Sequence, residues 1–529
     1  MATTVGIMGP EGTGPYNVGQ FRAKQALRAV LATQNKSVQH RRLKHVLEQN
    51  SLNDDVSCYE WRMAGQHYKD LCRRLRLPHP DQNDARFADI DLEDEDVEGG
   101  GGSPVSAAAG AAGAAAAPKQ QLLQPPVPDI GRDASAASAG SSYYDDEEDV
   151  YAMVPGLGDE DYPGFPAEEG PEELPDLSKH YSLLVAVLKE QPELYASLRT
   201  KRTSLGVSFA RCMKAAIDVQ GHPMVKAAGL FAGDAECYEL FAQAFGAIIP
   251  KIHLSFNPAE GQQVDPPDAA STIPDTLIDP TGEFVVGTQV QVRRNLLQYP
   301  TPVAMSLEQR LEVEELLQTA LTSCMPGAYA SLKSMTEQVA ESMQAFGVVF
   351  DAPESNLLRS AGFGKQWPHG RGFFAADDRG SFALVNNEEH LQFSSYRKDS
   401  NLKATYLDLQ QKMEALQSAM GTGVSFATSP GYGFLSTSLE HLGSAMEASV
   451  LLELPHLSEN PEFRSCAKRK KLVVKREPDI GERIWRIGHA ERLGPAASAQ
   501  ITVVVEGVST LVQLEKRLAN GEQVDLSSA

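Results

Sequence analysis

The stretch QWPHGRGFFAADDRGSFALVNNEEHLQF, residues 366–393, consists of short apolar runs separated by residues that favour turns. Its second half, continued to residue 397 as GSFALVNNEEHLQFSSYR, predicts two strands joined by a turn at NNEE. Asp377 and Asp378 fall between FFAA and SFALV, where acidic residues are common in a hairpin turn. The stretch therefore predicts successive hairpins, and the aspartate pair indicates a turn.

Helical and mixed segments flank this stretch. Residues 177–254 have a dense helical periodicity that Gly and Pro interrupt. A looser, acidic and proline-bearing connection follows, and then strands and helices alternate. Ser306 and Gln309 have the spacing of a capping box at the start of one helix. The pattern predicts a small helical domain at 177–265 and a mixed α+β domain at 283–529.

The first third of the chain differs in charge from the rest. Of the formal net charge of −22, residues 1–80 carry about +6 and residues 81–180 about −20. Residues 17–76 have helical periodicity, so we expect residues 1–80 to form a basic helical arm that either docks on a partner or packs on the main body. Residues 81–176 are rich in acids, Ala, Gly and Pro and have few large apolar side chains. We expect them to form a disordered linker.

Composition argues against several classes of protein. No run reaches the roughly 18 apolar residues that a membrane-spanning helix needs, and the N-terminus lacks the pattern of a secretory signal. The six cysteines are scattered without a C-x-x-C pair, which argues against a disulfide framework and a structural zinc site. We therefore expect a protein of a reducing intracellular compartment, with neither a membrane nor a nucleic acid as partner.

Long stretches of the two predicted domains, 177–265 and 283–529, carry a family resemblance. They are residues 192–253, which begin PELYASLRTKRTSLGVSF, YASLKSMTEQ at 329–338, and HAERLGPAASAQITVVVEGVSTLVQLEKRL at 489–518. Together with residues 366–393, they resemble the phosphagen (guanidino) kinases, the family of creatine and arginine kinases, in sequence and order. The resemblance implies the guanidino kinase fold, a small all-α domain followed by an eight-stranded antiparallel sheet flanked by helices. It also implies phosphoryl transfer between ATP and a guanidino compound, with arginines and magnesium at the phosphates.

Several positions depart from the pattern of that family. The strand FVVGTQVQVRRNL, residues 284–296, is similar to the family's segment with two phosphate-binding arginines at i and i+2, but it has Gln289 and Gln291 there. The resemblance places four more replacements: Gln392 and Glu447 for arginines, Ser429 for a reactive cysteine, and Leu451 for a histidine that packs on adenine.

Two positions agree with the family, since Arg476 aligns with the last phosphate-binding arginine and Glu388 with the carboxylate that binds the guanidinium. Loss of four arginines would remove on the order of 6–12 kcal/mol of phosphate stabilisation. We therefore expect a protein without enzymatic activity, with no catalytic residue, cofactor or metal. The alternative is a divergent active ATP:guanidino phosphotransferase that uses MgATP. Arg293 and Arg294 are then candidates to supply the charge, although alternation directs Arg294 away from the glutamines.

A folded body with a helical arm on an acidic tether suits a scaffold. We expect protein partners in a larger assembly, with a homo-oligomer as one arrangement. We expect a cytoplasmic or cytoskeletal location, with a cilium or flagellum as one candidate address.

Overall fold

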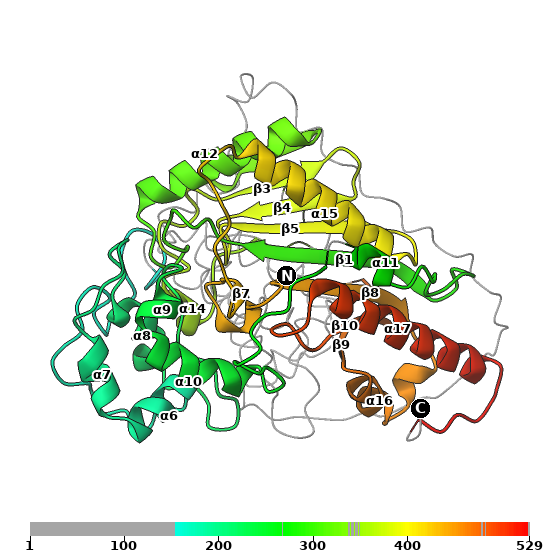
Figure 1. Cartoon of the computed structure of the whole chain (residues 1–529), viewed down its shortest axis with the longest axis horizontal. Helices are drawn as coiled ribbons and strands as arrows, with labels where there is room; N and C mark the ends of the chain where they lie inside the picture. The colour runs from blue at the N-terminus through cyan, green and yellow to red at the C-terminus, as the bar shows by residue number, and fades with distance from the viewer. Residues whose placement is uncertain are drawn as a thin grey trace, which may run out of the picture. The chain divides into compact units, whose positions relative to one another are not determined.

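The computed structural model describes residues 154–266, 268–336, 339, 343, 348, 350–477, 480–481 and 483–526. The predicted basic arm at 1–80 and the predicted linker as far as residue 153 lie outside the described residues. Within the described part, a group of short helices precedes a sheet that long helices accompany (Figure 1).

A small helical domain forms the N-terminal part of the described chain (Figure 1). Serine caps start two of its helices: Ser182 accepts a hydrogen bond from the Val185 amide, and Ser208 accepts one from the Arg211 amide. Apolar side chains from all of these helices share one core. The helices are α6 (Leu183–Glu190), α7 (Glu193–Leu198), α8 (Phe209–Asp218), α9 (Cys237–Leu240) and α10 (Ala242–Ile252).

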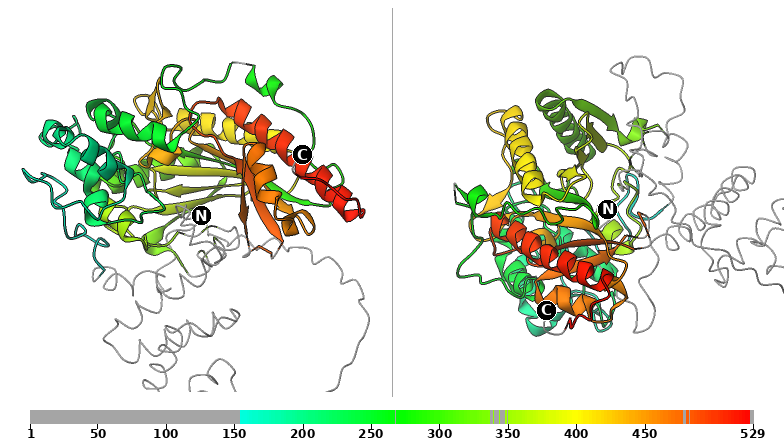
Figure 2. Two further views of the ribbon diagram at one scale, coloured as in Figure 1. Left: turned by 90° about the horizontal axis from the view of Figure 1, so that it is seen from below. Right: turned by 90° about the vertical axis from the view of Figure 1, so that its right-hand side faces the viewer.

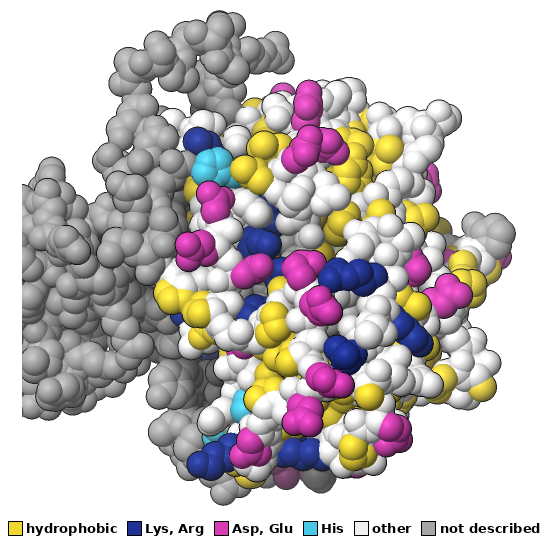
Figure 3. Space-filling model, turned by 90° about the vertical axis from the view of Figure 1, so that its left-hand side faces the viewer, with side chains coloured by type: hydrophobic (Ala, Val, Ile, Leu, Met, Phe, Trp, Pro, Cys, Tyr) yellow, Lys and Arg dark blue, Asp and Glu magenta, His cyan; other side chains and the backbone are white. Residues whose placement is uncertain are grey.

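The side of the molecule that this helical domain occupies has a mixed surface. Lys and Arg side chains are interspersed there with Asp and Glu, and apolar side chains lie between them (Figure 3). Among the described residues, the visible face therefore shows no gathering of one sign of charge that would attract a highly charged ligand.

A single antiparallel sheet forms the core of the second domain. Its eight strands run in the order β2-β3-β4-β5-β1-β8-β10-β9, so β1 lies between β5 and β8 near the middle. The predicted fold, a small all-α domain followed by an eight-stranded antiparallel sheet with flanking helices, is confirmed. The strands are β1 (Val285–Arg294), β2 (Gly327–Ser331), β3 (Gly372–Ala376), β4 (Ser381–Val385), β5 (Leu391–Arg397), β8 (Met446–Glu453), β9 (Leu472–Arg476) and β10 (Ile484–His489).

The hairpins predicted from residues 366–397 are strands β3, β4 and β5. Asp378 accepts a hydrogen bond from the Gly380 amide at 2.8 Å and so closes the β3–β4 turn. Asn386 follows β4 with a φ of 53°, a conformation that asparagine tolerates better than most residues. Local turn chemistry therefore sets both hairpins.

One face of the sheet is covered by three long helices. Val290 and Val292 of β1 point to this face and belong to the apolar core that the helices share with the sheet. Figure 2 shows α15 and α17 together on one side of the strands. These helices are α12 (Leu307–Cys324), which begins with the predicted capping box, α15 (Leu402–Ala419) and α17 (Ala497–Ala519).

Helix α17 is the one described helix with the length and apolar composition of a membrane span. It packs on β8, β9 and β10, and its buried residues include Ile501, Val504 and Val508. The core of the sheet therefore accounts for its apolar stripe.

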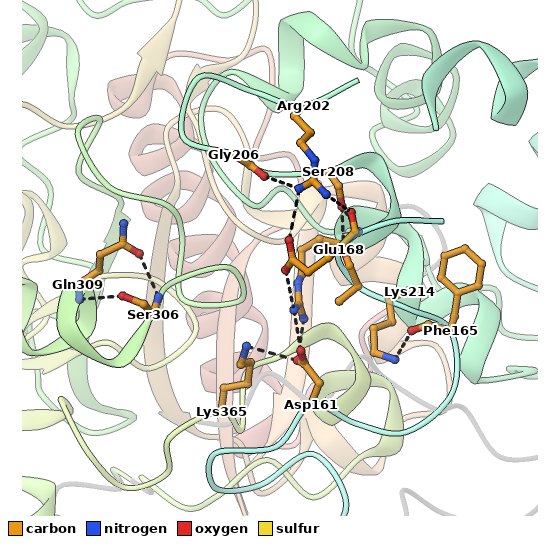
Figure 4. A network of polar contacts seen from close by, with 12 residues as sticks. Asp161, Phe165, Glu168, Arg202, Gly206, Ser208, Lys214, Ser306, Gln309 and Lys365 are labelled. Atoms are coloured by element: carbon orange, nitrogen blue, oxygen red, sulfur yellow. Dashed lines mark hydrogen bonds and ion pairs between the residues drawn. The ribbon is translucent and has the colours of Figure 1, made fainter. Parts of the chain in front are cut away.

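Residues 154–176 differ from the disordered linker that the sequence predicts. Leu157 and Phe165 are buried, and the Lys214 ammonium donates to the Phe165 carbonyl at 2.5 Å (Figure 4). Asp161 forms ion pairs with both Arg211 and Lys365. Acidic composition predicted disorder, but here it supplies partners for basic side chains of both domains.

The remaining described helices are short. They are α11 (Ala269–Thr272), α14 (Asn356–Ala361) and α16 (Phe463–Arg469), and a separate two-stranded hairpin consists of β6 (Thr428–Ser429) and β7 (Gly433–Phe434).

Candidate active site

The face of the sheet opposite the long helices carries polar side chains around β1. Alternation places Gln289, Gln291 and Arg293 on this face, while Val290 and Val292 enter the core. The strand register adds their cross-strand neighbours, because directly paired residues point to the same side. These neighbours are Gln392, Ser394 and Tyr396 of β5 and Glu447 and Ser449 of β8.

An arginine from β10 reaches this face. Arg486 donates from Nη1 to Gln289 Oε1 at 2.5 Å and to Ser449 Oγ at 3.2 Å. Its Nε donates to Glu477 Oε1 at 2.9 Å. Arg486 thus crosses β8 and brings a guanidinium group to a strand position that the sequence predicted to be uncharged.

Two more arginines meet at Glu447. Its Oε2 lies 3.7 Å from Arg293 Nη1 and 3.5 Å from Arg492 Nη2. Burial would raise the pKa of Glu447, but Arg492, Arg293 and Arg486 lower it to about 2. The acid that stands in place of an arginine of the family is therefore neutralised by neighbouring guanidinium groups.

Glu388 lies beyond Arg492 in the same network. Arg492 Nη1 and His441 Nδ1 are 3.0 Å apart, and His441 Nε2 lies 3.7 Å from Glu388 Oε2. Burial, helped by Arg293, lowers the pKa of His441 to about 4, so the imidazole is neutral at pH 7. These partners assign the ring proton to Nε2, on the side of Glu388.

Glu389, next in sequence, is fully enclosed. Its carboxylate accepts hydrogen bonds from the Thr437 amide at 2.8 and 2.9 Å and from Thr437 Oγ1 at 2.6 Å, and it also bonds Asn295 Nδ2. Burial raises the pKa of Glu389, against these hydrogen bonds, to about 7. The bonds tie the turn between β4 and β5 to the segment around residue 437, and so fix the backbone beside Glu388.

The other predicted positions are not all brought together. Gln392 is buried and pairs with Arg293 across β1 and β5, so it belongs to the polar face. Ser429 lies in the separate β6–β7 hairpin, where its hydroxyl accepts from the Tyr432 amide at 3.1 Å. Leu451 pairs with Arg486, and its side chain is largely buried.

Neither Arg476 nor Arg294 shares the face of Arg486. The register pairs Arg476 with Trp485, one position away from Arg486, so alternation directs it to the opposite side. Arg294 is buried with its guanidinium carbon 3.4 Å from the centre of the Phe434 ring, and burial lowers its pKa to about 9. Of the two arginines considered as substitutes, the structure therefore brings only Arg293 to the polar face.

Sequence reasoning missed Arg486, Arg492 and His441. Arg486 lies in the alternating strand IWRIGH, and Arg492 lies in HAERLG, part of the stretch that resembles the family. Both local patterns are visible in the sequence. The sequence does not show how β10 pairs with β8. Without that register, the closeness of Arg486 to Gln289 could not be predicted.

Comparisons with known proteins follow the order of the two domains. The family model for the ATP:guanido phosphotransferase N-terminal domain matches residues 178–250, and the model for its C-terminal catalytic domain matches residues 311–518. Creatine kinase M-type of Oryctolagus cuniculus is 32% identical over 365 residues, which cover 67% of this chain and 94% of that relative. The enzyme of the same name from Gallus gallus is 32% identical over 372 residues, 68% of this chain and 95% of its own.

Solved structures agree with the fold. A crystal structure of lombricine kinase matches with a TM-score of 0.62 and 25% identity over 67% of this chain and 97% of its own. A substrate-free duplicated taurocyamine kinase from Schistosoma mansoni has a TM-score of 0.58 and 24% identity, and covers 65% of this chain and 48% of its own. The second likeness supports the fold alone.

The prediction that the protein is not an enzyme is wrong. It is overturned by the match to the catalytic-domain model and by relatives that are kinases and align over nearly their whole length. The prediction counted only the positions at which the family has an arginine, on β1, β5 and β8, and left out arginines that reach the face from other positions. Arg293, Arg486 and Arg492 reach the same polar face, so the count of lost charges was too high.

Proposed function

Since the chain belongs to the ATP:guanido phosphotransferase, or phosphagen kinase, family, we propose that it is a divergent active member that transfers a phosphoryl group between ATP and a guanidino compound. The observation that carries the proposal is the convergence of Arg293, Arg486 and Arg492 on the polar face that also holds Glu388. Phosphoryl transfer needs little covalent chemistry from the protein and depends on positioning and on charge around the phosphate oxygens.

The donors on this face fit a phosphate ligand. Gln291 Nε2 and Arg293 Nε are buried and have no hydrogen-bond partner within the described part of the chain. Phosphate oxygens are acceptors only, and guanidinium forks match their geometry. MgATP would supply the phosphoryl group, and magnesium would arrive with the nucleotide phosphates, as is usual for this ion.

Glu388 is the group proposed to bind the guanidino substrate. A carboxylate can accept two parallel hydrogen bonds from a guanidinium, which fixes the orientation of the attacking nitrogen. In the transfer, a bond forms between that nitrogen and the γ-phosphorus, the bond from the γ-phosphorus to the oxygen of the leaving ADP breaks, and the proton that the nitrogen loses passes to the Glu388 carboxylate. The neutral His441 places its Nε2 3.7 Å from Glu388 Oε2, beside the carboxylate.

The test is direct assay of the full chain. Purified protein is incubated with MgATP and, separately, with creatine, arginine, lombricine and taurocyamine, and phosphorus NMR follows the formation of an N–P bond. We expect product with at least one compound, and a loss of about a hundredfold or more in kcat/KM for Glu388→Gln. Binding of MgATP without product from any of the four would contradict the proposal for these substrates.

The predicted cytoplasmic location agrees with membership of this family. The cytoskeletal or ciliary address, the scaffold role, the protein partners and the homo-oligomer remain predictions from the sequence.

A further inference from the structure

Three buried polar groups without partners lie together on the polar face. Within the described part of the chain, Gln291 Nε2, Arg293 Nε and Ser394 Oγ have no hydrogen-bond partner. Gln291 pairs directly with Ser394 across β1 and β5, and Arg293 follows two positions later on the same face. Gln291 is 6% exposed, Arg293 3% and Ser394 0%. Buried donors without acceptors destabilise a fold, so their grouping indicates a ligand that supplies several acceptor oxygens.

Arg486 supplies positive charge at the end of this group. Its Nε is paired with Glu477 Oε1 at 2.9 Å, which holds the side chain across the strands. Its Nη1 bonds two neutral side chains, Gln289 and Ser449, whereas Glu447 is paired with Arg293 and Arg492. Gln289 is two residues from Gln291 on the same face of β1. The guanidinium of Arg486 therefore ends beside the position of Gln289, where the resemblance to the family placed an arginine of β1.

We propose that Arg486 is the phosphate-binding residue that replaces the strand arginines in this chain, and that it acts with Gln291, Ser394 and Arg293 on the oxygens of a polyphosphate. That the polyphosphate belongs to a nucleotide rests on the proposed function. Arg486, on β10, would then take the position that an arginine of β1 has in the family the chain resembles. Arg486 can perform this role because it spans β8 and meets Gln289 at 2.5 Å.

The geometry disfavours the other arginines that could serve. Arg294 is stacked on Phe434 and donates to the carbonyls of Arg293 and Ser444. Lys475 pairs with Arg486, and Arg476 is the next residue of β9, so its side chain points to the opposite face of the sheet. Arg486 is thus the guanidinium next to Gln289 among the described residues.

The experiment measures binding of MgATP and of inorganic tripolyphosphate to the full chain by calorimetry. Three variants are compared with the native protein: Arg486→Gln, Arg486→Lys, and the double variant Gln289→Arg with Arg486→Gln, which moves the guanidinium back to β1. Arg517→Gln is the control, because Arg517 lies at the end of α17 and pairs with Glu522 at the half-exposed surface. Thermal unfolding followed by circular dichroism checks that each variant is folded.

We expect Arg486→Gln to raise the Kd for both ligands about tenfold or more and to lower the salt dependence of binding, since one charged contact is lost. Arg486→Lys should retain part of the affinity. The double variant should restore it to within about threefold, a rescue that a purely structural role for Arg486 would not produce. Arg517→Gln should bind as the native protein does.

Native-like affinity in Arg486→Gln would overturn the proposal, as would a native protein that binds neither ligand. If Arg486→Gln does not fold, the outcome is decided by the double variant and Arg486→Lys: weak binding by a folded double variant overturns the proposal. The proposed function fails differently. It fails if the native protein binds MgATP and forms no phosphorylated guanidino compound, and that result leaves the role of Arg486 in binding intact.

Discussion

Arg211 of the small helical domain and Asp161 of the preceding segment form a two-point ion pair, with both guanidinium nitrogens 3.0 Å from the two carboxylate oxygens. Asp161 also lies 3.5 Å from Lys365, which belongs to the second domain (Figure 4). Burial would raise the pKa of Asp161, but Arg211 and then Lys365 lower it below its usual value. One carboxylate therefore connects basic groups of both domains.

The first prediction concerns this connection. Asp161→Ala should lower the free energy of unfolding by about 1–2 kcal/mol, because it leaves the almost fully buried Arg211 without its two-point partner. Asp161 itself is 38% exposed, so solvent screening limits the effect. Denaturant unfolding measures it, and Asp159→Ala is the matched control, since Asp159 is exposed and lies in the same segment. Equal stability of the two variants would show that the ion pair contributes nothing measurable.

Local sequence patterns were sufficient to predict several strands, turns and a helix start, and to predict which side chains of β1 share the polar face. Alternation in residues 284–296 identified which side chains share a face, and the spacing of Ser306 and Gln309 identified a helix start. Turn residues identified the hairpins of β3, β4 and β5. These features depend on residues close together in the sequence, which is why sequence reasoning reached them.

Those local patterns could not predict contacts between segments that are far apart in the sequence. Arg486 and Gln289 are 197 residues apart, and their meeting depends on the register of β10 on β8 and of β8 on β1. In the same way, the acids of residues 154–176 suggested disorder because their basic partners, Arg211 and Lys365, lie far along the chain. Composition counts charges, but the fold decides which of them are paired.

The second prediction concerns Glu447. Glu447→Gln removes the charge that neutralises Arg293 and Arg492, so MgATP and tripolyphosphate should bind on the order of five- to tenfold more tightly. Without ligand, the variant should unfold more easily, since Arg293 is almost fully buried and would lose its ion partner. Calorimetry and thermal unfolding, each with and without ligand, measure the two effects.

The control for this variant is Glu453→Gln, at the exposed end of the same strand. It should change neither quantity. Weaker binding in Glu447→Gln would mean that Glu447 assists the ligand, for example by holding the arginines in place, and would contradict the view that it competes with phosphate.

The third prediction concerns the pH dependence of stability and Glu389. Its carboxyl has a pKa of about 7 in the folded protein against 4.5 as the reference value, because burial outweighs the hydrogen bonds from Thr437 and Asn295, and Glu388 raises it further. The folded state therefore binds the proton more tightly than the unfolded state. This contribution to stability is fully present below pH 4.5 and is lost as the pH rises through about 7, on the order of 3 kcal/mol in all.

Glu389→Gln keeps an acceptor and removes the titration, so the slope of unfolding free energy against pH between 5 and 7 should become flatter than in the native protein. The measurement is denaturant unfolding at a series of pH values, and Glu506→Gln on the exposed side of α17 is the control that should keep the native slope. Because the variant still contacts Thr437, it should remain folded at every pH tested. An unchanged slope in Glu389→Gln would assign the pH dependence to other groups and would leave Glu389 ionised in the fold at neutral pH.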